Sequence, residues 1–311
     1  MQSVSCNLCN SEEFKLLYQL PDLLLEREQL LYNLVRCTCC GLVYQNPRPT
    51  IEEMASHYPP EYESYTSNLF GGQISWLLKK AYKYGIDKRG RILSRQKKCG
   101  RLLDVGCATG TFLAGMQNRP EWQLYGVEIS DHAAAIARNQ HNLNVKTGTL
   151  EDVEFPTGFF DAVTLWDVLE HLHDPSKSLK EISRILKNDG ILIIRVPNLN
   201  SWDAKLFRSS WAGLDAPRHL YVFHPATLSQ LLSKANFDIL RMGCDIGSYT
   251  TFVLSLRFWL FAKGVEKPLR EAVSKILYHP IMRIVSAPFF YVYGLGLRGP
   301  LLTIVAGKRK I

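Results

Sequence analysis

Short apolar segments alternate with stretches of helical periodicity over residues 100 to about 247. The segments RLLDV, QLYGVEI, NVKTG, DAVTL and GILIIRV are largely continuous apolar runs, which is typical of strands that are covered on both faces. Strands that alternate with helices predict a parallel sheet in an α/β fold. DILRMGCDI and LLTIVAGK are two further strand candidates, which brings the predicted sheet to seven strands.

Helices are predicted between these strands because the intervening segments open on a Ser, Thr or Asp that can cap a helix. They cover residues 111–118, 131–139, 176–186 and 227–236, with a short helix at 201–207 and a basic amphipathic one at 73–98. Composition shifts divide the chain further. The predicted parts are a cysteine-rich module (1–45), a connector with its lead helix (46–98), the α/β core (99–246), a basic aromatic helical insertion (247–300), and a last strand with a basic tail (301–311).

The cysteines indicate the compartment. Of the 311 residues, 46% are hydrophobic and 21% charged, as in a globular protein that can bury a core. Eight cysteines in a chain of this size favour a reducing compartment and metal binding over a disulfide scaffold. The opening MQSVSCNLCN lacks a basic start followed by an apolar run, so we expect a cytoplasmic protein.

Two C-x-x-C pairs, Cys6 with Cys9 and Cys37 with Cys40, lie in the first 45 residues. The residue after each pair is Asn10 or Gly41, the two residue types that best tolerate the positive φ of a zinc knuckle. Four thiolates at this spacing predict a closed, tetrahedral, structural zinc site in a zinc-ribbon-like module. A redox role needs only one such pair and is the weaker interpretation.

The segment LLDVGCATGTFLAGM places a glycine-rich turn between the first strand of the α/β core and a helix. The strand ends near Asp104, and Gly106, Ala108 and Gly110 follow at alternate positions. Small residues there let the backbone approach a ligand closely. The spacing differs from the G-x-G-x-x-G of dinucleotide sites. Because the second strand closes on Glu128, which can accept hydrogen bonds from ribose hydroxyls, the pattern favours an adenosine group without a phosphate.

These residues resemble class I S-adenosylmethionine-dependent methyltransferases, from residue 101 to about 197. The resemblance implies a Rossmann-like, seven-stranded methyltransferase fold with S-adenosylmethionine as cofactor. It also implies that Asp104 supports the loop and that Glu128 holds the ribose. The remaining cofactor-binding residues that it implies are Gly106, Ala108 and Gly110 beside the methionine part, Ile129, Thr149, Leu150 and Asp152 toward adenine, and Trp166 beside the sulfonium.

The segment FDAVTLWDVLEHLHDP resembles the motif after the fourth strand in the small-molecule branch of that family. Asp167, Glu170 and His171 are spaced like the divalent-metal ligands of some quinone O-methyltransferases. Two interpretations stay open, a second metal site or a loop that these side chains fix by hydrogen bonds.

The segment WAGLDAPRHLYVF, residues 211–223, follows the fifth strand and its helix, where this fold places the acceptor. His219 is a candidate general base, and so is His171. Asp215 is expected to orient His219 or to bind a substrate hydroxyl, and Arg218 to bind a phosphate or carboxylate. The alternative is a polar turn whose groups bond to the backbone.

Basic residues are concentrated near the C-terminus. Residues 251–311 contain ten Lys or Arg against two acids, whereas the first 250 residues have 27 of each. The longest uncharged run of this C-terminal segment, 284–297, has 14 residues, which is short of the roughly 20 that span a bilayer. This aromatic, basic segment is predicted either to lie in the interface of an anionic membrane, on its inner face, or to pack as a helical lid.

The connector segments NPRPT and YPPEYESY, after the second cysteine pair, resemble the N-terminal zinc module of methyltransferases linked to sugar and surface-polysaccharide pathways. Together the two resemblances predict a methyltransferase that acts on a small-molecule or glycan acceptor, including a lipid-linked one, in sugar or cell-surface polysaccharide biosynthesis. One alternative is an RNA methyltransferase that grips RNA with its zinc module. Residues 1–45 hold three basic residues against five acids, which makes nucleic acid an unfavourable partner. The other alternative is a non-catalytic assembly protein that binds S-adenosylmethionine.

Overall fold

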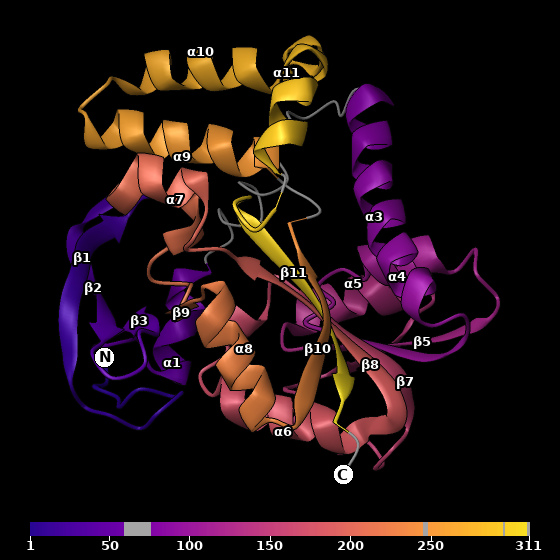
Figure 1. The fold of residues 1–311 in the computed structure, drawn as a ribbon. Coiled ribbons are helices and arrows are strands. Elements are labelled where there is room, and N and C mark those ends of the chain that lie inside the picture. Colours follow the sequence, from indigo (N-terminus) through magenta and orange to yellow (C-terminus); the bar gives the residue numbers. More distant parts are fainter. Residues whose placement is uncertain (59–75, 245–247, 295, 310–311) are drawn as a thin grey trace. The chain divides into compact units, whose positions relative to one another are not determined.

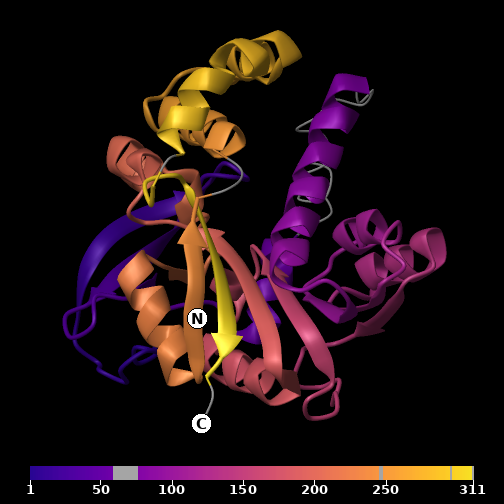
Figure 2. The same ribbon diagram turned by 45° about the vertical axis from the view of Figure 1, so that its right-hand side comes forward.

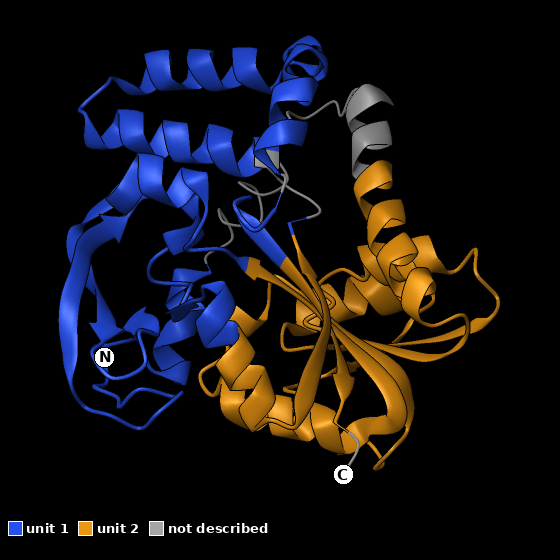
Figure 3. Ribbon diagram, viewed as in Figure 1, with its two compact units in different colours: residues 1–79, 197–228, 244–302 blue, residues 80–196, 229–243, 303–311 orange. Residues whose placement is uncertain are grey.

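The structure is a computed structural model that describes residues 1–58, 76–244, 248–294 and 296–309. The chain forms two compact units (Figure 3). Unit 1 comprises Met1–Lys79, Pro197–Leu228 and Cys244–Leu302, and unit 2 comprises Lys80–Val196, Ser229–Gly243 and Thr303–Ile311. The middle of the connector, with the predicted helix start at residue 73, the boundary at 246–247 and the last two residues fall outside the described ranges.

Unit 2 is built on the predicted seven-stranded sheet (Figure 1). The strand order is β10-β11-β8-β7-β4-β5-β6. The pairs from β8 through β7, β4 and β5 to β6 are parallel, and β10 pairs with β11 in the antiparallel sense. The strands are β4 (Gly100–Val105), β5 (Trp122–Glu128), β6 (Asn144–Thr147), β7 (Phe160–Trp166), β8 (Leu186–Pro197), β10 (Phe237–Gly243) and β11 (Leu301–Lys308). Every residue of β7 is buried, as expected for a central strand covered on both faces.

The helices between these strands lie within two residues of most predicted bounds, but the predicted caps are displaced. Ser130 and Asp174 cap α5 and α6 by accepting backbone N–H groups, whereas Gly110 precedes α4 without a side-chain cap. A cap has an extended backbone just outside the helix, whereas the predicted caps lie within the first three helical residues: Thr111, Asp131, Ser176 and Thr227. The helices are α3 (Trp76–Gln96), α4 (Thr111–Met116), α5 (Asp131–His141), α6 (Pro175–Ile185) and α8 (Pro225–Lys234).

Unit 1 contains a four-stranded antiparallel sheet in the order β1-β2-β3-β9. Its first three strands come from the cysteine-rich module: β1 (Phe14–Asp22), β2 (Arg27–Cys37) and β3 (Val43–Gln45). The fourth, β9 (Tyr221–Val222), belongs to the segment WAGLDAPRHLYVF. Tyr44 pairs with Tyr221 and Val43 with Val222. The segment therefore supplies an edge of the module's own sheet.

Helices form the rest of unit 1. The predicted insertion folds as α9 (Ser248–Ala262), α10 (Lys267–Tyr278) and α11 (Pro280–Tyr293). Of these helices, α9 adjoins α7 (Trp202–Phe207) in both ribbon views (Figures 1 and 2). Shorter elements are α1 (Ile51–Met54), η1 (Ala55–His57), η3 (Arg208–Ser210) and η4 (Ala212–Leu214). Within the described ranges, no helix combines the length and the apolar character needed to cross a membrane.

One hydrophobic core joins the segments of unit 1. It contains Leu34 and Val43 from the module, Trp211 and Leu214 from the segment before β9, and Phe258 from α9. At the turn between β1 and β2, the Glu26 carboxylate accepts hydrogen bonds from Arg257 and Arg270 of the insertion. Module, segment and insertion thus pack as one body in this unit.

Candidate functional site

The glycine-rich turn after β4 has a backbone that most residues cannot adopt. Gly106, Ala108 and Gly110 have φ angles of 65°, 49° and 77°. A Cβ atom on Gly106 would lie 2.8 Å from Cγ2 of Val168, and one on Gly110 would lie 2.5 Å from Cδ1 of Leu143. Both glycines are therefore required by the backbone and by close packing, while Ala108 places a methyl group on the turn.

Glu128, at the end of β5, holds this turn from the neighbouring strand. Its Oε2 accepts the N–H of Ala108 at 2.9 Å and its Oε1 accepts the N–H of Ser130 at 2.9 Å. Each carboxylate oxygen can accept a second hydrogen bond, so Glu128 has capacity for a hydroxyl donor. The next side chain, Ile129, is apolar and 67% exposed, which suits an adenine ring.

Asp104 lies in β4 before the turn, buried to 3% exposure. The hydroxyl of Thr164 donates to its Oδ1 at 2.6 Å. Burial raises the pKa of this carboxyl to about 7, although the Thr164 hydrogen bond and the charge of Arg89 act in the opposite direction. Burial therefore destabilises the charged carboxylate more than these two partners stabilise it.

Asp104→Asn should reveal this cost as a pH dependence of stability. A folded pKa of about 7, above the usual 3.8, means that the folded state holds the proton more tightly than the unfolded chain. Wild-type stability should fall relative to Asp104→Asn as pH rises from about 4 to 7, by at most about 4 kcal/mol, and the difference should be constant above pH 8. Urea unfolding of both proteins across this range measures it.

Asp152→Asn is the matched control, because hydrogen bonds from Thr149 lower the pKa of the Asp152 carboxyl. Its stability contribution should be lost only as pH falls through that lowered pKa, so the difference from wild type should stay constant between pH 5 and 8. A constant difference for Asp104→Asn over the same range would contradict the prediction.

The turn after β6 holds the other predicted adenine-side residues. The Asp152 carboxylate accepts the N–H of Thr149 at 3.1 Å and its hydroxyl at 2.6 Å. Leu150, between them, is 3% exposed. Asp152 therefore shapes the turn, and the Leu150 side chain packs inward.

Trp166, at the end of β7, already faces cations of the protein. The guanidinium carbons of Arg89 and Arg195 lie 5.2 Å and 5.8 Å from the ring centroid, and Phe112 packs edge-on at 5.4 Å. The ring is 8% exposed. Its predicted place beside a sulfonium remains a prediction.

The loop after β7 contains the three residues that were predicted either to bind a second metal or to fix the loop by hydrogen bonds. Asp167 has a φ of 60° and forms an ion pair with Arg195, whose Nε lies 2.8 Å from Oδ1. Glu170 is fully buried and His171 half-buried, both in the short helix η2 (Leu169–His171). Because Asp167 is neutralised by a guanidinium, the structure favours the hydrogen-bonded interpretation for this residue over a metal ligand.

The prediction that Arg218 binds a substrate anion is wrong. Its side chain is 0% exposed, and it donates two hydrogen bonds to Asp22, at 2.8 Å and 2.7 Å, and others to Asp215, the shortest at 2.7 Å. Two carboxylates thus neutralise one buried guanidinium, which leaves no surface for a ligand. Arg218 instead attaches the segment to β1 of the module.

His219 is oriented by the backbone rather than by Asp215. Its Nδ1 lies 3.0 Å from the carbonyl oxygen of Gly213. A carbonyl only accepts hydrogen bonds, so the proton belongs on Nδ1 and the lone pair on Nε2. Nε2 lies 4.0 Å from the nearest Asp215 oxygen, beyond hydrogen-bond distance. The module also holds the backbone of His219 in place, since the Gln45 side-chain amide donates a hydrogen bond to the His219 carbonyl at 3.0 Å.

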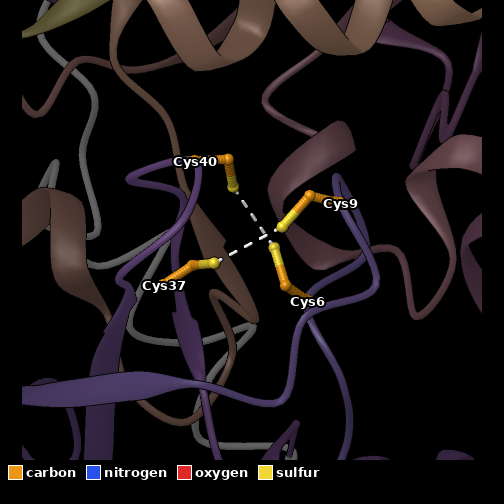
Figure 4. A group of neighbouring side chains, drawn as sticks. All are labelled: Cys6, Cys9, Cys37 and Cys40. Atoms are coloured by element: carbon orange, nitrogen blue, oxygen red, sulfur yellow. Dashed lines mark hydrogen bonds between the residues drawn. The ribbon is translucent and has the colours of Figure 1, made fainter.

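The four predicted zinc ligands converge (Figure 4). Sγ of Cys6 lies 3.4 Å from Sγ of Cys40, and Sγ of Cys9 lies 3.5 Å from Sγ of Cys37. Ligands 2.3 Å from a tetrahedral zinc would be about 3.8 Å apart, so the donor set fits zinc with a small expansion. The spare thiol, Cys39, is exposed and bonds to Ser11 instead.

The knuckle geometry predicted for the turns around these cysteines is confirmed. Asn10 and Gly41 have φ angles of 60° and 80°, and their N–H groups donate to the carbonyls of Cys6 and Cys37. Burial opposes ionisation of Cys37, but hydrogen bonds from the N–H groups of Cys40 and Cys39 and from the side chains of Cys9 and Cys40 together outweigh it and lower the pKa of that thiol to about 7. One ligand is thus prepared to bind metal as a thiolate.

Similarity to known proteins was found for the α/β core. Residues 77–242 match the model of a family described as a methyltransferase domain. An uncharacterized methyltransferase from Schizosaccharomyces pombe is 33% identical over 35% of this chain and 44% of its own length. A ubiquinone/menaquinone biosynthesis C-methyltransferase from Geotalea uraniireducens is 24% identical over 66% of this chain and 91% of its own. The chain spans less than half the length of the first of these relatives.

Solved structures share the fold. The cyclase SpnF has a TM-score of 0.53 at 19% identity, with 85% of this chain and 98% of that chain covered. A phosphoethanolamine N-methyltransferase from Haemonchus contortus, solved with S-adenosylhomocysteine, has a TM-score of 0.53 at 17% identity, with 91% and 65% covered. Since one is named a cyclase and the other a methyltransferase, likeness of fold alone does not define the reaction.

Proposed function

The chain belongs to the family of methyltransferase domains, and from that premise we propose that it transfers a methyl group from S-adenosylmethionine to a small-molecule acceptor. The observation that carries the proposal is the turn of Gly106, Ala108 and Gly110, which the Glu128 carboxylate binds at 2.9 Å. This arrangement supports binding of an adenosyl group that carries no phosphate. S-adenosylmethionine supplies an activated methyl group on a sulfonium.

The proposed cofactor contacts follow from this geometry. The backbone of the turn lines the methionine part, and Glu128 accepts hydrogen bonds from ribose hydroxyls. Ile129 and the turn of Thr149, Leu150 and Asp152 border the adenine. Asp104 and its Thr164 partner keep the end of β4 in place beneath the turn.

The proposed acceptor is a hydroxyl group of a free or lipid-linked glycan in polysaccharide biosynthesis. Names of relatives support a small molecule, among them a ubiquinone biosynthesis O-methyltransferase from Neisseria meningitidis, 28% identical over 52% of this chain. A sugar hydroxyl is a weak nucleophile and gains from a general base. His219 suits that role because Nδ1 is tied to Gly213 and Nε2 carries the lone pair. His171 is the second candidate.

Zinc at Cys6, Cys9, Cys37 and Cys40 has a structural role in this proposal. Four cysteine ligands leave no open position for a reactant. The metal would join the first knuckle, which precedes β1, to the second knuckle, which lies between β2 and β3. Strand β3 pairs with β9, and its Gln45 side chain holds the His219 carbonyl. The module then acts as a support for the acceptor segment, a role that needs no basic surface.

A labelled-methyl assay tests the function. Purified protein with S-adenosylmethionine labelled in the methyl group is incubated with fractionated glycan, lipid-linked glycan and RNA from cell extract. Label is expected in a glycan fraction with stoichiometric S-adenosylhomocysteine, and Glu128→Ala, which removes the ribose acceptor, should lose it. Label in RNA would overturn the acceptor class. Tight cofactor binding without S-adenosylhomocysteine in any fraction would overturn catalysis.

A further inference from the structure

The outer surface of α11 is apolar and exposed. None of its residues, all of which the structure describes, is buried. The exposed fractions lie between 58% and 74% for six large side chains: Ile281, Ile284, Val285, Phe289, Tyr291 and Val292. A chain with other apolar residues well buried rarely leaves such a continuous patch in water unless something binds there.

The two faces of α11 have different partners. Arg283, Phe290 and Tyr293 face the rest of unit 1: the Arg283 guanidinium lies over Tyr249, Phe290 packs edge-on against Phe252, and Tyr293 donates to Asp203. Ile281, Ile284, Val285, Pro288 and Val292 follow the i, i+3, i+4, i+7, i+11 spacing of one helix face. That face is opposite to the anchored one and carries no charge.

The neighbouring helix α10 extends the apolar surface and adds cations. Leu269 and Ile276, which are 58% and 61% exposed, lie seven residues apart on one face. Lys267 and Lys275 are also exposed on α10. Arg257 and Arg270 do not contribute, because Glu26 neutralises them. Lys267 lies 4.0 Å from the Glu271 carboxylate one turn later, so Lys275, which is exposed, is the cation that α10 offers to a partner.

We propose that this surface, formed by the exposed apolar residues of α10 and α11, binds the interface of an anionic lipid bilayer. An apolar helix face in a part of the chain with net positive charge matches the acyl boundary and the headgroups of such a surface. Residues 248–293, which form α9 to α11, carry six bases and two acids, and this charge stays positive when Glu26 is included. A second copy would therefore bring like charges together, whereas an anionic surface attracts them. The inference goes beyond the proposed reaction and does not depend on it.

Flotation with vesicles, in the absence of any methyl acceptor, tests the proposal. The probes are vesicles of phosphatidylcholine alone and of phosphatidylcholine with phosphatidylglycerol, at low and at physiological salt. Wild type should float with the anionic vesicles and much less with the neutral ones. Ile284→Glu/Val285→Glu, both at exposed positions, should weaken binding at least about tenfold by placing charge in the apolar interface.

Leu240→Glu is the control, because Leu240 is equally exposed, at 58%, but lies on β10 in unit 2. It should float like wild type, and all three proteins should bind S-adenosylmethionine with equal affinity, which shows that they are folded. Wild type that stays unbound at low salt, a double variant that binds like wild type, or a control that loses binding equally would overturn the proposal. So would a wild-type dimer that the double variant dissociates, since a second copy would then occupy the face.

Discussion

Replacing Cys37 or Cys40 with serine is expected to lower the turnover number at least about 100-fold. Loss of zinc should displace the acceptor segment, and a small misalignment of reacting groups lowers a rate by about that factor. Affinity for S-adenosylmethionine should change far less, since the glycine-rich turn and Glu128 belong to unit 2. Stability of unit 1 should also fall, as structural zinc contributes folding free energy directly. Steady-state kinetics, cofactor titration and metal content by mass spectrometry measure these effects.

Cys39→Ser is the matched control, one or two residues from the ligands and outside the cluster. It should keep one zinc per chain and wild-type turnover. Asp22→Asn tests whether the module acts through its contact with the acceptor segment. It leaves the four cysteines intact and removes a charge partner of the buried Arg218. If the module supports the acceptor segment, Asp22→Asn should also lose turnover with zinc retained. Full activity after zinc loss would contradict a supporting role.

Replacing His219 with alanine is expected to lower the turnover number by about 10²- to 10⁴-fold, the usual contribution of a general base. The dissociation constant of S-adenosylmethionine should stay within about twofold, because no cofactor residue belongs to the segment. Added imidazole should restore part of the rate, which a purely structural residue would not allow. Single-turnover kinetics and isothermal titration calorimetry provide both quantities.

His171→Ala separates the two candidate bases. If His219 is the base, His171→Ala should cost less turnover and should not respond to imidazole. A larger, imidazole-rescued loss in His171→Ala would assign the base to His171. Equal loss of cofactor binding and turnover in His219→Ala would make that side chain structural, since its Nδ1 hydrogen bond to Gly213 also holds the turn.

The α/β core was predictable because its signals are local. β7 is wholly buried and β8 is buried from Gly190 to Pro197, so each contributes a largely apolar run to the sequence. The glycine turn was predictable for the same reason, since its positive φ angles demand small residues at known positions. The positive φ of Asn10 and Gly41 in the knuckles follows the same rule.

The environment of Arg218 was not predictable, because its main partner lies 196 residues earlier. No sequence pattern around Asp22 indicates that its carboxylate pairs with the guanidinium of Arg218. In the sequence, a fully buried arginine and an anion-binding arginine look alike. The pairing of β3 with β9 has the same origin: β9 has two residues, too few for a periodic signal.

The sheet of the cysteine-rich module also has a consequence for the order of folding. During synthesis, β1, β2 and β3 leave the ribosome long before β9, whose neighbour His219 follows Gln45 by 174 residues. Until then the outer edge of β3 exposes unpaired backbone groups, which are prone to pair with other chains. A fragment that ends after β3 should therefore aggregate even when loaded with metal. The first 45 residues are thus unsuited to expression as an independent domain.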